Sequence, residues 1–395
     1  TAIRQATISL PSTTRSHSNG MAFRQLLHQT RIDFLGVLKS TPFIVILLAG
    51  LLNMTVSLLY VKESFYGGTS FPVTYNIIDT IRGTLYAFLI GIIAFYTGVL
   101  VWKERDARQD EIQDALPHPG WVVSLAKLLA MTLLIEVILL LAVITGMVIQ
   151  TAFGYHTYEV NQYFISLVLL DGLFFFYLTV LSMLVHTLIN NKYIAYFIFI
   201  VLVIVNLFVW PALNMSSNMA AYGGRPSYTY SDMNGYGPFT TGLTWFNIYW
   251  LLFAAILVMV IIFFHVRGKE VSLIYRWKAG MQELSAGRKT LLISLVILWM
   301  ACGSFVFYNT KVLNTYTPPK TSECLRADYE KKFKRYQNHA QPRITDVRYA
   351  IDLFPEERKL IAKGTWMLKN KSAVLIDSIF LTMPQNVICD VNIPG

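Results

Sequence analysis

Residues 101–127 have the sequence VWKERDARQDEIQDALPHPGWVVSLAK, a charged stretch between two long apolar segments. This much charge is too costly to bury in hydrocarbon, so we predict a loop at a membrane face. Ile112 and Leu116 lie four residues apart among acidic residues, a spacing compatible with one face of a helix. Pro117 and Pro119 are expected to end such a helix. The stretch thus predicts a short amphipathic helix on the water side; a plain solvated loop is the equally open alternative.

The composition of the whole chain points to the same environment. Of its 395 residues, 54% are hydrophobic and only 14% are charged, and the mean hydropathy is +0.48. These values exclude an ordinary soluble domain and are typical of a polytopic membrane protein. The net charge of +10 is typical of membrane proteins whose basic loops face anionic lipid, so we infer no nucleic-acid partner.

Seven apolar runs, each near the ~20 residues that span a bilayer, predict seven transmembrane helices. Before them, residues 1–21 are expected to be a flexible linker, and residues 22–39 show helical amphipathic spacing. We predict that this amphipathic helix lies along the membrane surface; packing on a soluble partner is the alternative. The fold class is therefore an all-α polytopic membrane protein. The predicted spans are 42–60, 84–102, 122–150, 164–186, 193–213, 246–266 and 290–308.

Lys and Arg are unevenly distributed between the loops. They are frequent before the first apolar run and between the sixth and the seventh, and scarce in the loops on the other side. The positive-inside rule then places the N-terminus and the 101–127 loop in the cytoplasm. With seven spans, the C-terminal segment is expected on the opposite, extracytoplasmic side.

The C-terminal segment changes character. Residues 309–343 are polar and basic and predict an extracytoplasmic linker or charged helix, whereas residues 344–395 predict a β-rich segment. Its expected strands are 346–353, 360–368 and 378–382. Cys324 and Cys389 both follow the last span, so a disulfide between them is a further expectation, although the sequence does not fix their separation.

Two acidic residues lie within the predicted spans. Glu136 is in the middle of the third span and Asp171 is some way into the fourth. Charge in lipid is costly and often marks a functional position, so both are candidates for lining a translocation path. A buried polar contact between helices is an equally open interpretation. Residues 220–250 form a Tyr-, Trp-, Gly- and Pro-rich stretch, for which a turn-rich aromatic cap is favoured over a ligand site.

A family resemblance is carried by Glu104-Arg105-Asp106, Ile112, Leu116-Pro117 and the later Lys127. This pattern resembles the first cytoplasmic loop of ABC-2-type exporter permeases, with Asp106 in place of the usual second Glu. The resemblance implies that residues 22–308 form an ABC-2-type transmembrane domain. It also implies that the loop at 103–120 couples the chain to a separate nucleotide-binding ABC ATPase subunit. Such a transporter needs a second permease half or a homodimer.

The longer pattern of residues 104–117 resembles a bacterial subgroup in which the permease is fused to a zinc aminopeptidase of the aminopeptidase N type. Residues 344–395 are similar to the opening strands of that β-domain. The resemblance implies a bacterial inner membrane with a periplasmic C-terminal segment. Since the chain begins with Thr1 rather than Met, we expect it to be a segment of a longer protein.

The residues present do not predict catalysis by this chain. No His is followed by Glu, so the His-Glu-x-x-His zinc motif does not occur, and there is no Gly-x-x-x-x-Gly-Lys-Ser/Thr phosphate loop. We therefore expect ATP on a partner subunit and any zinc in a region beyond these residues. The favoured function is the permease of an ATP-driven exporter. The alternatives are a membrane anchor for an extracytoplasmic metallopeptidase and a scaffold subunit of a larger envelope complex.

Overall fold

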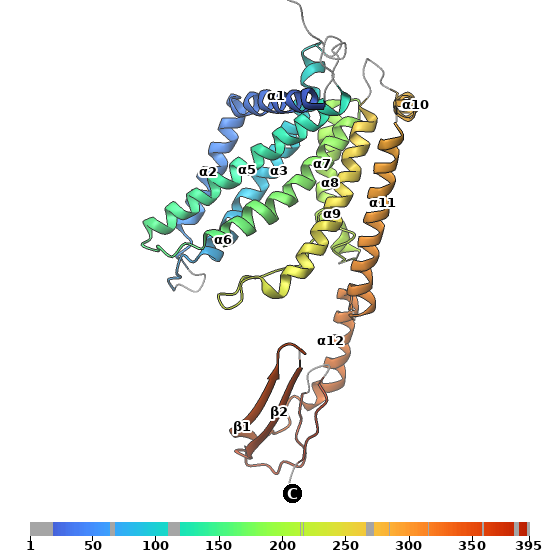
Figure 1. The fold of residues 1–395 in the computed structure, drawn as a ribbon. Helices are drawn as coiled ribbons and strands as arrows, with labels where there is room; N and C mark the ends of the chain where they lie inside the picture. The colour runs from blue at the N-terminus through green and yellow to red at the C-terminus, as the bar shows by residue number, and fades with distance from the viewer. Residues whose placement is uncertain are drawn as a thin grey trace, which may run out of the picture. The chain divides into compact units, whose positions relative to one another are not determined.

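The computed structural model describes residues 19–63, 68–109, 119–213, 215, 217–265, 272–283, 285–314, 316–357, 359–382 and 387–392. The chain divides into two compact units, Thr1–Pro318 and Pro319–Gly395 (Figure 1). The first unit holds the predicted transmembrane domain, and the second holds the predicted β-rich segment.

The first unit is helical. In its described part, seven helices are long and apolar enough to cross a membrane, which confirms the predicted number of apolar helices. Two short segments are π-helical: η1 leads directly into α7, and η2 directly follows α11. In chain order the elements are α1 Asn19–Leu38, α2 Thr41–Leu59, α3 Thr74–Asp106, α5 Gly120–Ala152, α6 Val160–Tyr163, η1 Phe164–Asp171, α7 Gly172–Leu188, α8 Lys192–Ala212, α9 Gly237–Phe264, α10 Leu273–Glu283, α11 Ala286–Phe307 and η2 Tyr308–Val312.

Two helices begin well before the positions predicted from hydropathy. α3 begins at Thr74 instead of residue 84, and α9 begins at Gly237 instead of residue 246. The added turns contain polar residues such as Asp79 and Arg82. A hydropathy pattern detects only the apolar part of a helix, whereas backbone hydrogen bonding continues beyond it.

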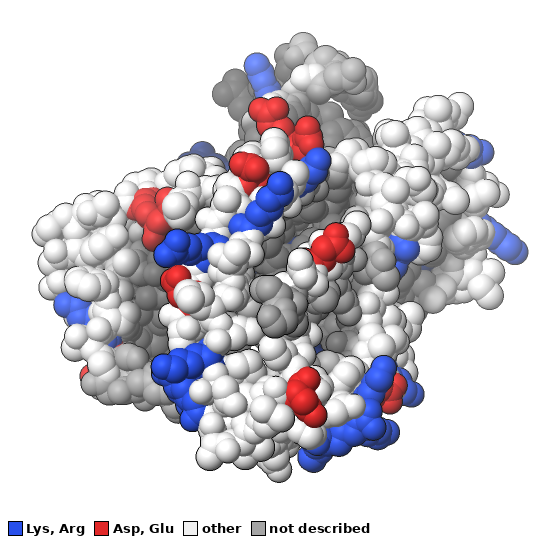
Figure 2. All heavy atoms as spheres, turned by 90° about the horizontal axis from the view of Figure 1, so that it is seen from below, with Lys and Arg blue, Asp and Glu red and all other residues white. Residues whose placement is uncertain are grey.

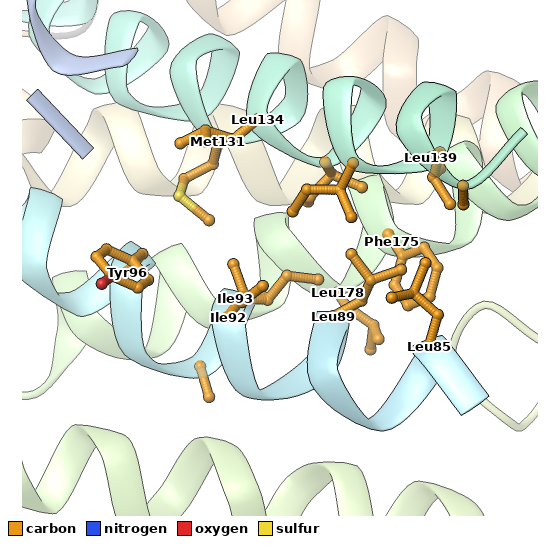
Figure 3. Close-up of a cluster of buried hydrophobic side chains, with 14 of the residues drawn as sticks. Leu85, Leu89, Ile92, Ile93, Tyr96, Met131, Leu134, Leu139, Phe175 and Leu178 are labelled. Atoms are coloured by element: carbon orange, nitrogen blue, oxygen red, sulfur yellow. The ribbon is translucent and has the colours of Figure 1, made fainter. Parts of the chain in front are cut away.

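The centre of the helical unit is formed by α3, α5 and α7. Half of the most apolar part of α3 is buried, against 17% for α8 and α11. Figure 3 shows the core, in which side chains of the three helices interdigitate. Lipid tails are as apolar as leucine, so in a bilayer such contacts stabilise mainly through close packing. The labelled core residues are Leu85, Leu89, Ile92, Ile93, Tyr96, Met131, Leu134, Leu139, Phe175 and Leu178.

We call the end of the unit where α3 ends and α5 begins the loop end, and the opposite end the far end. α1 runs across the loop end at a large angle to α2 (Figure 1). Its buried Leu26 packs with Val122 and Ala126 of α5. The amphipathic helix predicted at 22–39 is thus present as α1, and one of its faces is occupied by the bundle.

The second unit contains α12 Pro319–Phe333, the 3-10 turn η3 Lys334–Tyr336, and the strands β1 Arg343–Phe354 and β2 Lys359–Lys369. α12 occupies part of the predicted linker. The strands pair antiparallel, with Val347 opposite Trp366 and Leu353 opposite Leu360, and their side chains are almost all exposed. Figure 2 shows one face of the molecule, where groups that contain both basic and acidic side chains lie between areas of uncharged surface.

Two expectations for the second unit are wrong in this structure. Residues 378–382 are not a strand: instead of a strand ladder, the Gln341 side chain bonds them, accepting from Phe380 N at 2.8 Å and donating to Ser378 O at 3.3 Å. Cys324 and Cys389 are free and exposed, so the expected disulfide is not formed. Cys324 is on α12 and Cys389 is in an irregular segment, and no shared element brings the two thiols together.

Candidate functional site

The last turn of α3 carries Lys103, Glu104, Arg105 and Asp106, which we call the loop base. Glu104 accepts from Lys127 of α5 at 2.5 Å, and both side chains are largely buried, with 14% and 6% exposure. A pair this deeply buried requires both partners, because removal of either leaves an uncompensated charge. The last turn of α3 and the second turn of α5 are therefore tied together on the two sides of the connection.

The loop base is also tied to α1. Lys103 donates to Asp33 at 2.9 Å, and the Asp33 side chain is fully buried. Gln29, one turn earlier in α1, donates to the other Asp33 oxygen at 3.1 Å. The sequence pattern assigned Asp33 to the polar face of an amphipathic helix, and its burial could not be foreseen without the contact with α3.

A third ion pair joins the loop base to α8. Asp106 accepts from Lys192, the first residue of α8, at 2.5 Å. Arg105 lies with its guanidinium 5.1 Å from the centre of the Trp102 ring. Arg105 also lies close enough to Arg276 of α10 to affect it: burial lowers the pKa of Arg276, and the charge of Arg105 lowers it further. Lys103, Glu104 and Asp106 thus each pair with a different helix.

The end of α3 is fixed by its backbone as well. Arg108 has a φ of 53°, in the left-handed region. Its N–H bonds Arg105 O at 3.1 Å, and the N–H of Gln109 bonds Glu104 O at 2.9 Å. This pair of bonds is a Schellman motif, which stops a helix and satisfies its last carbonyls. The other predicted coupling residues, Ile112, Leu116 and Pro117, lie outside the described residues.

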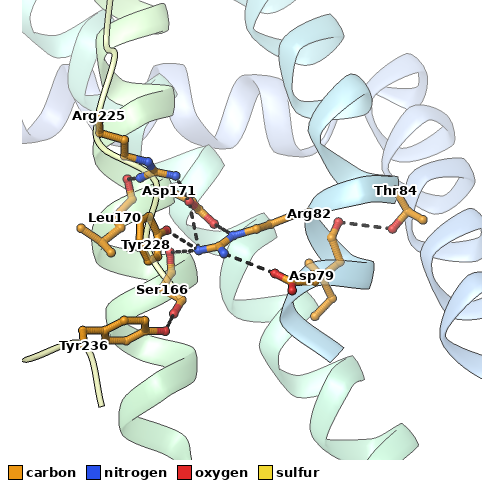
Figure 4. Close-up of polar contacts among 10 residues, drawn as sticks. Asp79, Arg82, Thr84, Ser166, Leu170, Asp171, Arg225, Tyr228 and Tyr236 are labelled. Atoms are coloured by element: carbon orange, nitrogen blue, oxygen red, sulfur yellow. Dashed lines mark hydrogen bonds and ion pairs between the residues drawn. The ribbon is translucent and has the colours of Figure 1, made fainter. Parts of the chain in front are cut away.

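At the far end, Asp171 joins three segments of the chain (Figure 4). Its carboxylate is fully buried and accepts from Arg82 Nε of α3 at 2.8 Å and from Arg225 Nη2 at 2.5 Å. Arg225 also donates to Leu170 O at 2.7 Å, and the exposed Asp79 lies 3.6 Å from Arg82. Asp171 therefore neutralises two guanidinium groups, one from a span and one from the 213–236 connection.

Aromatic side chains of that connection complete the cluster. The Tyr228 hydroxyl accepts from Arg82 Nη2 at 2.6 Å, and its ring centre is 5.3 Å from both guanidinium groups. Tyr236 bonds Ser166 of η1. Burial opposes the charge on Arg225, but the neighbouring Asp171 and Tyr228 outweigh it and raise the pKa of Arg225. It therefore stays positively charged.

The backbone of the same connection is held against the spans. Tyr222 donates to Tyr177 O at 2.9 Å, and Trp250 Nε1 donates to Gly224 O at 2.8 Å. Gly223 has a φ of 71°, and a Cβ on Gly224 would lie 2.6 Å from the Asn218 carbonyl oxygen. These two glycines are required for the close turn. Residues 217–236 thus form a turn-rich segment packed on the spans, whereas residues 237–250, which the sequence interpretation included in the cap, belong to α9.

The other candidate acid, Glu136 of α5, lies against Gly172, the residue after Asp171. A Cβ on Gly172 would collide with Glu136 Oε1. Glu136 Oε2 is buried, and no described residue gives it a hydrogen-bond partner. The structure thus brings the two predicted acids to neighbouring positions with different surroundings. Both carboxylate oxygens of Asp171 accept hydrogen bonds from arginines, whereas Glu136 Oε2 has no partner among the described residues.

Sequence reasoning missed Arg82 and Arg225 as partners of Asp171. The predicted second span began at residue 84, which left Arg82 outside it, and Arg225 is separated from Asp171 by 54 residues. The available signal was an arginine directly next to an apolar run, together with an acid that must find a counter-ion. Segments with π-helical hydrogen bonding, such as η1, are frequent at functional sites.

No group of three or more His, Cys, Asp or Glu residues that could hold a metal occurs in the described part of the chain. Comparison with known protein families finds no match, and no curated protein matches the chain significantly. The class defined by the fold is a helical protein whose described residues include seven apolar helices of membrane-spanning length.

Proposed function

We propose that this chain is the membrane-spanning permease subunit of an ATP-driven exporter, and that the 103–120 loop receives motion from a nucleotide-binding partner subunit. The loop end is then the cytoplasmic end of the bundle. The single observation that carries the proposal is the loop base, where Lys103, Glu104 and Asp106 pair with Asp33, Lys127 and Lys192.

The arrangement suits a coupling element because one short turn is bonded to α1, α5 and α8. A displacement of the loop reaches several helices at once, since packed helices move as rigid elements. An isolated solvated turn does not require three ion pairs to three helices. The resemblance of Glu104-Arg105-Asp106 to the loop of ABC-2-type permeases supports the same role, as does the spacing of Ile112 and Leu116, which fits a helix docked in a groove.

The second permease half follows from the same proposal, as a second copy of this chain or a related subunit. In this chain, the candidates for lining the translocation path are Glu136, which has a free acceptor oxygen, and Asp171. Asp171 is fully buried and already paired with two arginines, so we assign it to closing the far end rather than to contact with cargo. Glu136 is the better candidate for contact with cargo.

The test is copurification of the ATPase subunit with Ile112→Asp/Leu116→Asp. Each anchor at an interface contributes about 1–3 kcal/mol, so we expect the double variant to lose the ATPase and its stimulation while the spans remain inserted. Gln109→Asp/Gln113→Asp is the matched control, because it adds the same two negative charges to the loop at positions that are already polar in the sequence. Retention of the ATPase at wild-type stoichiometry and stimulation by the double variant refutes the coupling role and favours the metallopeptidase anchor or the scaffold.

A further inference from the structure

α10 presents three different faces around its axis. Successive residues of a helix are rotated by about 100°, so Arg276 and Gly280 fall on one side and Lys278 and Gln282 on another. Between these two sides lies an arc of apolar residues. The arc consists of Leu273, Ile274, Trp277 and Met281, with exposures of 47%, 71%, 54% and 47%.

The first face attaches α10 to the ends of other helices. Arg276 is only 3% exposed. It donates to Thr187 O of α7 at 2.8 Å and to Phe264 O of α9 at 2.9 Å. A Cβ on Gly280 would lie 2.8 Å from Phe263 O, so only glycine allows this approach. These contacts hold α10 at the level where α7 and α9 end.

The apolar arc is left uncovered at that level. Trp277 touches the bundle through Phe263, with ring centres 5.3 Å apart, but more than half of its surface is exposed. Four large apolar side chains on one arc, beside a packed face and a polar face, are typical of a helix that lies in a membrane interface. Water is a poor solvent for such an arc.

The charge around the arc is positive. Lys278 lies at the border between the apolar arc and the polar face, and Arg288 and Lys289 are exposed at the start of α11. The described residues 272–283 and 285–289 contain four Lys or Arg and one Glu, a net charge of +3. Exposed apolar residues of α11 follow from Leu291 onward, so Arg288 and Lys289 mark the boundary between headgroups and hydrocarbon.

We propose that α10 is an anionic-lipid anchor: its apolar arc inserts into the headgroup region, and Lys278, Arg288 and Lys289 contact lipid phosphates. Charge complementarity favours an acidic leaflet over a zwitterionic one. The tether at Arg276 transmits this contact to α7 and α9. The proposal requires that the bundle lies in a membrane but does not depend on the exporter function, so either can fail without the other.

The experiment uses the full chain in vesicles of equimolar phosphatidylcholine and phosphatidylglycerol. A nitroxide is attached at Ile274→Cys on the apolar arc or, as the matched control, at Gln282→Cys on the polar face. The background carries Cys324→Ser and Cys389→Ser, which removes the exposed free thiols. Relaxation of the nitroxide by oxygen, which concentrates in lipid, is compared with relaxation by a water-soluble nickel chelate.

We expect oxygen to dominate at Ile274→Cys and the nickel chelate to dominate at Gln282→Cys. Equal nickel access at both positions overturns the proposal. Protection of the Ile274→Cys nitroxide from both reagents also overturns it, since a protein such as an ATPase subunit or a second copy then covers the arc.

The charge is tested separately by native mass spectrometry of phosphatidylglycerol retained by the purified chain. Lys278→Glu is expected to reduce retention by about fivefold or more, and Lys278→Arg to preserve it. Equal retention by Lys278→Glu and wild type overturns the requirement for an anionic lipid.

Discussion

Asp171 offers the sharpest quantitative test of the structure. Asp171→Ala removes the only carboxylate of the cluster that is fully buried and leaves Arg82 and Arg225 facing each other. Loss of one partner of a buried ion pair typically costs about 3–5 kcal/mol. The two arginine side chains keep 22% and 18% exposure, so water compensates them in part. We therefore expect a loss at the lower end, about 3 kcal/mol, in the free energy of unfolding of the bundle.

The assay is reversible unfolding in mixed detergent and dodecyl sulfate micelles, followed by circular dichroism, together with limited chymotrypsin cleavage after Tyr228, whose hydroxyl bonds Arg82. The cleavage site should become accessible in Asp171→Ala, because the 213–236 connection loses its ionic contact with η1. Asp79→Ala is the matched control: Asp79 is 73% exposed and 3.6 Å from Arg82, and exposed pairs contribute about 0–1 kcal/mol. A loss below about 1 kcal/mol in Asp171→Ala, with the bond after Tyr228 still protected, refutes the role of Asp171 as a shared counter-ion.

Two further predictions concern the packing of Glu136 and the orientation of the chain. Gly172→Ala places a methyl group against Glu136 Oε1, the end of a flexible side chain that can move aside, so we expect the clash to cancel most of the roughly 0.5–1 kcal/mol that Ala gains over Gly in a helix. In a Glu136→Ala background the full gain should appear, and equal effects in both backgrounds contradict the observed contact. If the loop end is cytoplasmic, a membrane-impermeant thiol reagent added outside the cell should label Ser372→Cys and spare Ser285→Cys, in chains whose natural exposed cysteines are replaced by serine. The reverse pattern inverts the proposed orientation.

Local patterns predicted the helical part of the chain well. Seven apolar runs and one amphipathic segment were enough for α1 and the seven long helices, because apolar composition and helical periodicity are encoded within each segment. The strands β1 and β2 were recognisable from alternation, whereas 378–382 shows the same alternation and forms no ladder. Strand pairing depends on a neighbouring strand, and here the Gln341 side chain provides the hydrogen bonds instead.

The candidate sites were less accessible to sequence reasoning. Glu136 and Asp171 stood out as acids in apolar runs, but their different surroundings depend on Gly172 and on two arginines remote in sequence. α10 was assigned to a loop, since its eleven residues are too few for a span. Its position becomes meaningful only through the contacts of Arg276 with α7 and α9.

The separation of the Asp171 partners along the chain has a consequence for biogenesis. A ribosome makes Arg82 first, Asp171 89 residues later, and Arg225 a further 54 residues after that. If the bundle is inserted in a membrane as proposed, α3 is made before the buried counter-ion of Arg82, with only the exposed Asp79 of its own helix nearby, and its full neutralisation has to wait for η1 and α7. Arg225 can join only after its connection has emerged on the side of the membrane where Asp171 is anchored. The complete cluster can therefore form only after about the first seven-tenths of the helical unit has been inserted with the correct orientation.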